Sequence, residues 1–242
     1  MIALPPFERS ALLIDLDGTL LDIAPAPDQV VVPPGLPGTL SALRRFLDDA
    51  VAVVTGRPVE TIDALLNDSI FAVAGEHGGA IRHGPGLPVR RPPLPAPPSE
   101  WLVEAERLAV EHPGALLEVK ARGFTLHYRA IPEAGERLHQ GLQAMLAGST
   151  DFEVLQGLMM WEVRPRGTDK GHAVHALMQQ APFATRLPVF IGDDVTDEDG
   201  IRAANALGGA GLRVPEVFGD AAGVRSWLHE IASIGRWPNT TP

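Results

Sequence analysis

Residues 11–20 read ALLIDLDGTL, an apolar run that ends in two aspartates two positions apart. A short run of this kind, Ala11–Ile14, predicts a buried strand that leads into a turn. Val51–Val54, 71–74 and Leu187–Ile191 repeat the pattern, and polar residues follow each of them. Helical patterns separate these runs, so the sequence predicts an α/β fold with an open, doubly wound parallel sheet.

The strand–helix alternation is interrupted in the middle of the chain. Residues 84–98 contain seven prolines, which neither a helix nor a central strand accommodates. Two predicted helices, 99–111 and 132–146, follow, and each is succeeded by a pair of strand-like runs. The four runs are 115–120, 124–129, 152–155 and 158–163. We therefore expect a core formed by 1–82 and 165–242, with 83–164 as a smaller α+β insertion.

Composition excludes several classes of protein. The 242 residues carry a net charge of −10, whereas nucleic acid or an anionic membrane would require a basic surface. The absence of cysteine excludes disulfides, thiol nucleophiles and iron–sulfur clusters. No run approaches the ~18 apolar residues of a membrane span. Met1–Leu13 has no leading positive charge and contains two prolines, which is not typical of a signal peptide. We expect a cytoplasmic protein.

Polar residues follow four of the predicted strands. Ligands collect at the carboxyl ends of parallel strands, so we expect these side chains to meet although they are far apart in sequence. They are Asp15, Asp17, Thr55, Arg57, His77, Asp193 and Asp194. Four carboxylates in one site would repel one another unless a cation neutralised them. Their oxygens suit Mg²⁺, which we predict as the cofactor.

The same set of residues suits phosphoryl transfer. Thr55 and Lys170 can donate hydrogen bonds to phosphoryl oxygens, and Lys170 is one of only two lysines in the chain. One carboxylate can attack phosphorus covalently while a second, protonated carboxyl group gives a proton to the leaving oxygen.

These residues resemble the four motifs of the haloacid dehalogenase superfamily, in order and at similar spacing: residues 15–20, Thr55, Lys170 and 192–197. The resemblance implies that Asp15 is the nucleophile and Asp17 the general acid/base. It also implies that Thr55 and Lys170 bind phosphate.

The same resemblance implies a set of metal ligands. Asp193 would bind Mg²⁺ beside Asp15 and the backbone carbonyl of Asp17, with Asp194 or Asp197 nearby or acting through water. We expect Glu198 and Asp199 to be only the acidic start of a helix.

Further segments resemble the trehalose-6-phosphate phosphatase family over nearly the whole chain. They include 54–58, 74–78, 117–120, 127–129 and 162–165. This resemblance implies that 83–164 is a cap domain inserted in the core and that the substrate is a sugar phosphate, hydrolysed to trehalose and inorganic phosphate. The residues implied to bind it are Glu118, Lys120 and Glu162 in the cap and Arg57 and His77 in the core.

Other interpretations remain open at this stage. The same chemistry could act on another sugar phosphate, such as sucrose 6-phosphate or mannosyl-3-phosphoglycerate, or in a phosphomutase. A receiver-like module also uses acidic residues, a threonine and a lysine, but it is half this length and lacks a counterpart of Asp17. Individual residues also have structural alternatives: Arg57 could pair with Glu60, His77 could bond the loop backbone, and Lys120 could protect an edge strand.

Overall fold

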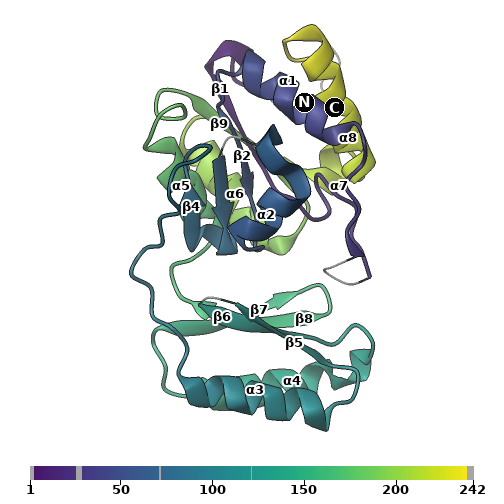
Figure 1. Ribbon diagram of the computed structural model, residues 1–242, viewed down its shortest axis with the longest axis vertical. Coiled ribbons are helices and arrows are strands. Elements are labelled where there is room, and N and C mark those ends of the chain that lie inside the picture. Colours follow the sequence, from purple (N-terminus) through teal and green to yellow (C-terminus); the bar gives the residue numbers. More distant parts are fainter. Residues whose placement is uncertain (1–2, 26–28, 71, 121, 239–242) are drawn as a thin grey trace. The chain divides into compact units, whose positions relative to one another are not determined.

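The computed structural model describes residues 3–25, 29–70, 72–120 and 122–238. The chain forms two compact units (Figure 1). The first contains Met1–Arg91 and Asp169–Pro242, and the second contains Pro92–Thr168. The proline-rich stretch 84–98 thus contributes to both units. That the second unit is a cap that selects the substrate stays a prediction.

The first unit is built on a six-stranded sheet in the order β10-β9-β1-β2-β3-β4. All neighbouring strands are parallel except β3 and β4. The strands are β1 (Ser10–Ile14), β2 (Val51–Val54), β3 (Ala72–Gly75), β4 (Ala80–Arg82), β9 (Leu187–Gly192) and β10 (Ala210–Arg213). β1, β2 and β3 are buried along their whole length, as expected for apolar strands covered on both faces.

Helices cover both faces of this sheet. α1 packs against α8, and α5 packs against α6. The helices are α1 (Leu36–Phe46), α2 (Val59–Leu66), α5 (Lys170–Met178), α6 (Glu198–Ala206), α7 (Val214–Val217) and α8 (Ala221–Ile234). The chain leaves β1 through α1 toward β2, and it leaves β9 through α6 toward β10 on the other side. The strand order therefore reverses between β1 and β9, which is where open α/β sheets bind ligands.

The second unit is an antiparallel sheet in the order β5-β6-β8-β7, with two helices on one face (Figure 1). Its elements are α3 (Ser99–Glu111), β5 (Leu116–Lys120), β6 (Gly123–His127), α4 (Gly135–Met145), β7 (Phe152–Gly157) and β8 (Met160–Pro165). Apolar residues of the helices and strands form a core of their own, which includes Leu108, Phe124, Leu138 and Val163.

The predicted fold class is confirmed, with two local differences. β4 is a three-residue strand that pairs antiparallel with β3, so the core sheet is mixed rather than wholly parallel. Gly123, which lies between the predicted runs 115–120 and 124–129, is the first residue of β6. A Cβ there would lie 2.0 Å from the Val163 carbonyl oxygen, so only glycine allows β6 and β8 to approach this closely. Phe71, assigned to a strand by the sequence pattern, lies outside the described residues.

Within the described part of the chain, no helix combines the length and apolar character needed to cross a bilayer. The cytoplasmic location stays a prediction.

Candidate active site

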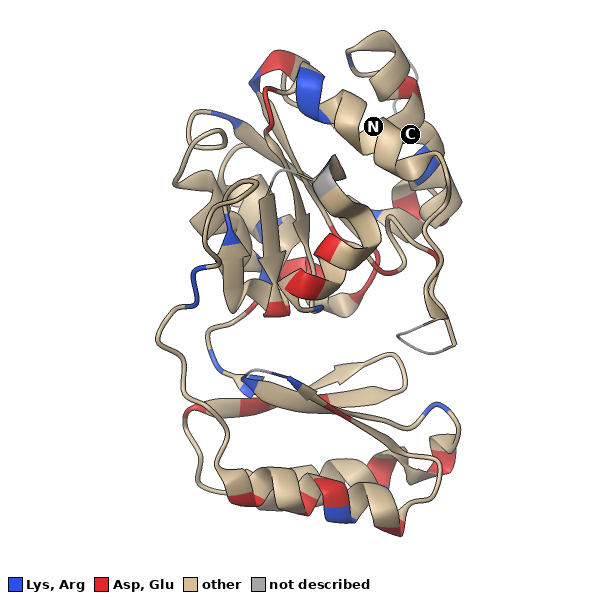
Figure 2. Ribbon diagram, viewed as in Figure 1, with Lys and Arg blue, Asp and Glu red and all other residues tan. Residues whose placement is uncertain are grey.

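Asp15 follows β1 and Asp193 follows β9, so both stand at the point where the strand order reverses. The Asp15 N–H donates to the Ile191 carbonyl at 2.9 Å, which extends the β1–β9 hydrogen bonds to the base of the site. Asp15 is only 4% exposed. The sheet therefore fixes a buried carboxylate at the edge where open α/β sheets bind ligands, and acidic residues gather there (Figure 2).

Lys170, the first residue of α5, is 3% exposed and contacts two of the acids. Its Nζ donates to Asp15 Oδ1 and to Asp197 Oδ1, each at 2.6 Å. Burial disfavours the ammonium charge, but attraction to the two carboxylates outweighs burial and raises the pKa of Lys170. The lysine therefore remains charged and joins Asp15 to Asp197.

Three acids converge beside this lysine. Asp15, Asp193 and Asp197 each present a carboxylate oxygen within 4.8 Å of the others. Burial, and then the charge of Asp197, raise the pKa of Asp15 well above its ordinary value. Burial and the charges of Asp197 and Asp194 raise the pKa of Asp193 to about 6. One lysine does not neutralise three carboxylates, so the cluster favours an additional cation.

Two glycines make room for this cluster. Gly18 has a φ of +81°, and a Cβ at this position would lie 2.1 Å from Asp193 Oδ2. A Cβ at Gly192 would lie 2.2 Å from Asp197 Cγ. The Thr19 hydroxyl donates to Asp193 Oδ1 at 3.2 Å and helps to orient it. The space and the all-oxygen donor set both fit a hard divalent cation such as Mg²⁺.

Asp197 belongs to this cluster, although the sequence pattern favoured Asp194. Asp194 caps the 3-10 turn Val195–Asp197 by accepting a hydrogen bond from the Thr196 N–H. Asp197 reaches back and accepts from the N–H groups of Asp193 and Asp194, both at 3.1 Å. Asp194 is not among the three acids that converge. The Asp-x-x-Asp spacing of a capping box is the sequence signal that could have indicated the inward direction of Asp197.

Asp17 is held by an arginine from the neighbouring strand end. Arg57 Nε donates to Asp17 Oδ2 at 2.7 Å, and Nη2 donates to Oδ1 at 2.8 Å. This paired geometry fixes both position and orientation of the carboxylate. Glu60, the alternative partner for Arg57, contacts Arg91 at 3.5 Å. The carboxylate of Asp17 is thus engaged with Arg57.

Thr55 and His77 lie together at the ends of β2 and β3. Thr55 is buried, and its hydroxyl oxygen accepts from the Arg57 N–H at 3.2 Å, which leaves the hydroxyl hydrogen able to donate. The His77 N–H donates to the Thr55 carbonyl at 3.0 Å. A Cβ at Gly56 would lie 2.4 Å from His77 Nε2, so the glycine permits the ring to pack here. His77 is a buried neighbour of Thr55.

The expected sugar-binding residues of the second unit also lie together. Lys120 Nζ donates to Glu162 Oε1 at 2.6 Å, and both side chains are largely buried. Glu118 contacts His127 at 2.8 Å. The sheet thus presents Glu118, Lys120 and Glu162 within one group of charged side chains.

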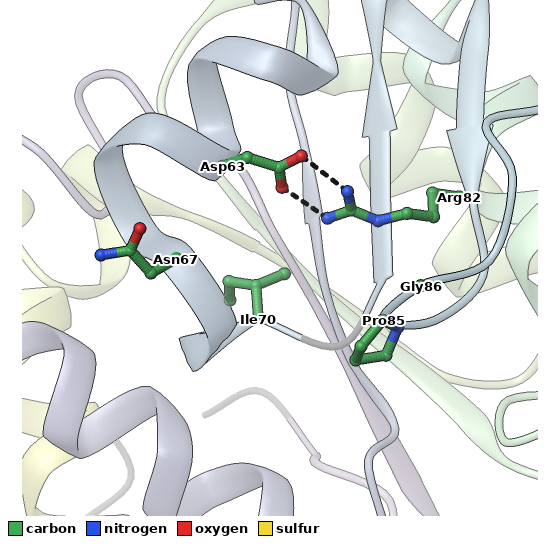
Figure 3. Close-up of a pocket in the computed structure, with 6 residues that line it drawn as sticks. All are labelled: Asp63, Asn67, Ile70, Arg82, Pro85 and Gly86. Carbon is green, nitrogen blue, oxygen red and sulfur yellow. Dashed lines mark hydrogen bonds and ion pairs between the residues drawn. The ribbon is translucent and has the colours of Figure 1, made fainter.

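A separate cavity of about 500 Å³ lies elsewhere in the first unit (Figure 3). Arg82 and Asp63 line it and form a paired ion contact at 2.6 and 2.7 Å. The remaining lining residues are Asn67, Ile70, Pro85 and Gly86. None of the residues predicted to act on a phosphate lines this cavity.

Known structures share this fold. The C-terminal domain of trehalose-6-phosphate phosphatase from C. albicans superposes with a TM-score of 0.79, at 21% identity, and covers 93% of this chain and 92% of that one. A haloacid dehalogenase-like hydrolase from Bacteroides thetaiotaomicron superposes with a TM-score of 0.62 at 14% identity, covering 92% of this chain and 99% of that one. At these identities the likeness establishes the fold.

Comparison with sequence relatives establishes the family of this chain as well as its fold. Trehalose-6-phosphate phosphatase of Escherichia coli is 38% identical over 232 residues, which are 95% of this chain and 85% of that protein. A probable trehalose-phosphate phosphatase of Sinorhizobium fredii is 40% identical over 205 residues, which are 84% and 77% of the two chains. Residues 13–219 match the profile of the family described as trehalose-phosphatase. On these grounds the chain belongs to the trehalose-phosphatase family.

Proposed function

We propose that this chain is a phosphatase that hydrolyses trehalose 6-phosphate to trehalose and inorganic phosphate. Family membership supports the substrate. The buried contact between Asp15 and Lys170, beside Asp193, is the observation that carries the chemistry. It places a carboxylate and a permanent positive charge at the edge of the sheet where a phosphoryl group would bind.

Asp15 is the nucleophile of the first step in this mechanism. Lys170 donates to its Oδ1, so we expect Oδ2 to attack phosphorus. The bond between phosphorus and the sugar oxygen breaks, Asp17 gives that oxygen a proton, and trehalose leaves an acyl phosphate on Asp15. In the structure both carboxylate oxygens of Asp17 accept hydrogen bonds from Arg57, so this step requires Arg57 to release one of them.

The second step regenerates the enzyme. Asp17 takes a proton from a water molecule, whose oxygen attacks phosphorus and releases inorganic phosphate and the Asp15 carboxylate. Arg57 orients Asp17 for this task. We expect the Thr55 hydroxyl and Lys170 to donate hydrogen bonds to phosphoryl oxygens during both steps.

Mg²⁺ is the cofactor that we propose for this site. Asp15 and Asp193 would hold it together with the backbone carbonyl of Asp17, while Asp197 or Asp194 acts directly or through water. The convergence of Asp15, Asp193 and Asp197 supports this choice. The bound cation would offset the negative charge of the transferring phosphoryl group.

Sugar recognition is proposed for the second unit. Glu118 and Glu162 can accept hydrogen bonds from sugar hydroxyls, and Lys120 can donate to them. Their grouping on one sheet supports this role. Arg57 and His77 are the proposed contacts from the first unit.

Phosphate release tests the proposed function. The wild-type chain is assayed with trehalose 6-phosphate, sucrose 6-phosphate and mannosyl-3-phosphoglycerate, each with and without Mg²⁺. We expect Mg²⁺-dependent release with the highest kcat/KM on trehalose 6-phosphate. Release from another sugar phosphate but not from trehalose 6-phosphate would contradict the substrate, and Mg²⁺-independent release would contradict the cofactor.

A further inference from the structure

One face of the sheet in the second unit carries a group of polar side chains. α3 and α4 pack on the opposite face, against residues such as Phe124 and Val163. Side chains alternate along strands, so their neighbours in sequence point the other way. The polar group consists of Glu118, Lys120, Thr125, His127 and Glu162, from β5, β6 and β8. The register places Thr125 opposite both Glu118 and Glu162.

An ion pair spans the middle of this face. Lys120 on β5 contacts Glu162 on β8, although β6 lies between the two strands. The contact crosses β6 where that strand carries only Gly123, opposite Lys120, and Thr125, opposite Glu162. Thr125 is 0% exposed. Lys120 thus donates a hydrogen bond to Glu162, and the hydrogen bond that orients Glu118 comes from another group.

His127 is that group. Leu116 lies directly opposite His127, so Glu118, two residues further along β5, is the diagonal neighbour of His127. Long side chains can reach each other across a diagonal of this kind. Nε2 of His127 lies 2.8 Å from Glu118 Oε2. An ionised carboxylate only accepts hydrogen bonds, so Nε2 carries the proton and donates it. This hydrogen bond is the main cause that lowers the pKa of Glu118, which keeps the carboxylate ionised.

The pair is oriented but still accessible. The Glu118 side chain is 35% exposed and that of His127 is 21% exposed. The bond to His127 uses one acceptor position on one oxygen, and a carboxylate has further positions for incoming hydroxyl groups. A free glutamate would lose much rotamer freedom on binding a ligand, whereas one already held by a neighbour loses less.

We propose that His127 is a positioning residue for sugar binding: it holds Glu118 in the orientation in which that carboxylate accepts a hydrogen bond from a sugar hydroxyl of the substrate. The inference rests on the proposed function, which makes Glu118 a sugar contact. His127 itself acts through Glu118 and does not have to touch the phosphoryl group or the sugar.

The test compares His127→Leu, which removes the donor, with His127→Gln, which retains an N–H donor at the end of the side chain. Both are assayed on trehalose 6-phosphate and on p-nitrophenyl phosphate. We expect His127→Leu to raise KM for trehalose 6-phosphate about ten-fold, with kcat changed less than about two-fold. Turnover of the aryl phosphate remains unchanged, and His127→Gln recovers much of the affinity.

His139→Leu is the matched control, because His139 stacks on Trp161 and takes no part in the polar group. Combining His127→Leu with Glu118→Ala gives a second readout. If His127 acts through Glu118, the double variant has the same KM as Glu118→Ala alone. If His127→Leu does not unfold cooperatively on heating, the comparison uses His127→Asn, whose shorter side chain falls short of Oε2.

The outcomes separate the two proposals. Additive losses in the double variant, or equal losses on both substrates, would overturn the positioning role while the proposed function stands. A wild-type chain that does not hydrolyse trehalose 6-phosphate would overturn both. Three results together would support the inference. His127→Leu raises KM for trehalose 6-phosphate but not for the aryl phosphate, His127→Gln restores much of the affinity, and His127→Leu has no further effect when Glu118 is already alanine.

Discussion

Arg57 donates hydrogen bonds to both carboxylate oxygens of Asp17, at 2.7 and 2.8 Å, and the two residues stand at the ends of neighbouring strands. The arginine was expected to contact the substrate, and the structure joins it to the proposed general acid/base. An arginine fork of this kind restricts a carboxylate more strongly than a single contact does. Arg57 can therefore control the chemical step through Asp17.

Replacing Arg57 with methionine should lower kcat on trehalose 6-phosphate by roughly 10- to 100-fold, because Asp17 loses its fixed orientation. Arg57→Lys keeps the charge but loses the two parallel hydrogen bonds, so its kcat should lie between those of the wild type and Arg57→Met. Arg82→Met is the matched control, since Arg82 makes the same kind of paired contact with Asp63 at the separate cavity (Figure 3). A rise in KM with unchanged kcat in Arg57→Met would assign Arg57 to substrate binding alone.

Asp197→Asn should weaken Mg²⁺ binding by roughly 10- to 100-fold, measured by calorimetric titration. Asp197 accepts hydrogen bonds from Lys170 and from the backbone N–H groups of Asp193 and Asp194, so its loss disturbs both charge and geometry at the cluster. Asp199→Asn, which removes an acid paired with Arg202 on the surface, should leave Mg²⁺ binding unchanged. Equal effects of the two substitutions would contradict a special role for Asp197.

The sequence predicted the architecture and the convergence of Asp15, Lys170 and Asp193, because apolar strands followed by polar residues indicate where strand ends meet. It named Asp197 only as an alternative to Asp194, nearby or acting through water. An acid at the start of a helix has an ordinary explanation in the helix dipole, and only the capping geometry turns this side chain inward.

Local sequence patterns did not specify two further features. Asp17 and Arg57 come from separate strand ends. The sequence indicated Arg57 as a substrate contact, with Glu60 as the alternative partner. β4 has only three residues, which is too short for a periodic pattern, and its antiparallel pairing depends on the preceding turn. The Asp17–Arg57 contact joins distant segments, which is a tertiary property that local patterns do not specify.

The pH dependence of the free energy of unfolding should reveal the raised pKa of Asp193. Its pKa is about 6 in the folded chain, above the ordinary value of 3.8. Between these values the folded chain retains a proton that the unfolded chain has lost, so Asp193 contributes less to the free energy of unfolding as pH rises. The difference in this free energy between wild type and Asp193→Asn should fall from pH 4 to about pH 6 in metal-free urea titrations.

Mg²⁺ should reverse this trend. The cation binds the ionised carboxylate, so saturating Mg²⁺ should raise the unfolding free energy of the wild type at pH 7 more than that of Asp193→Asn. A difference between the two proteins that does not change with pH, or an equal effect of Mg²⁺ on both, would contradict this account.

Lys120→Met should raise KM for trehalose 6-phosphate about ten-fold and leave turnover of p-nitrophenyl phosphate nearly unchanged. The substitution removes the proposed donor to the sugar together with its contact to Glu162. Arg164→Met is the control, because Arg164 on the same sheet pairs with Glu153. If both variants lose the two activities in parallel, Lys120 stabilises the second unit instead of selecting the sugar.

The most direct test of the central claim compares two aspartates of the same unit. Asp15→Asn and Asp63→Asn each remove a carboxylate that pairs with a positively charged side chain. The partner is Lys170 at the acidic cluster for Asp15 and Arg82 at the separate cavity for Asp63. Initial rates of phosphate release from trehalose 6-phosphate with Mg²⁺ should fall by more than about 1,000-fold in Asp15→Asn and by less than about two-fold in Asp63→Asn. Substantial turnover by Asp15→Asn would contradict covalent catalysis at this site.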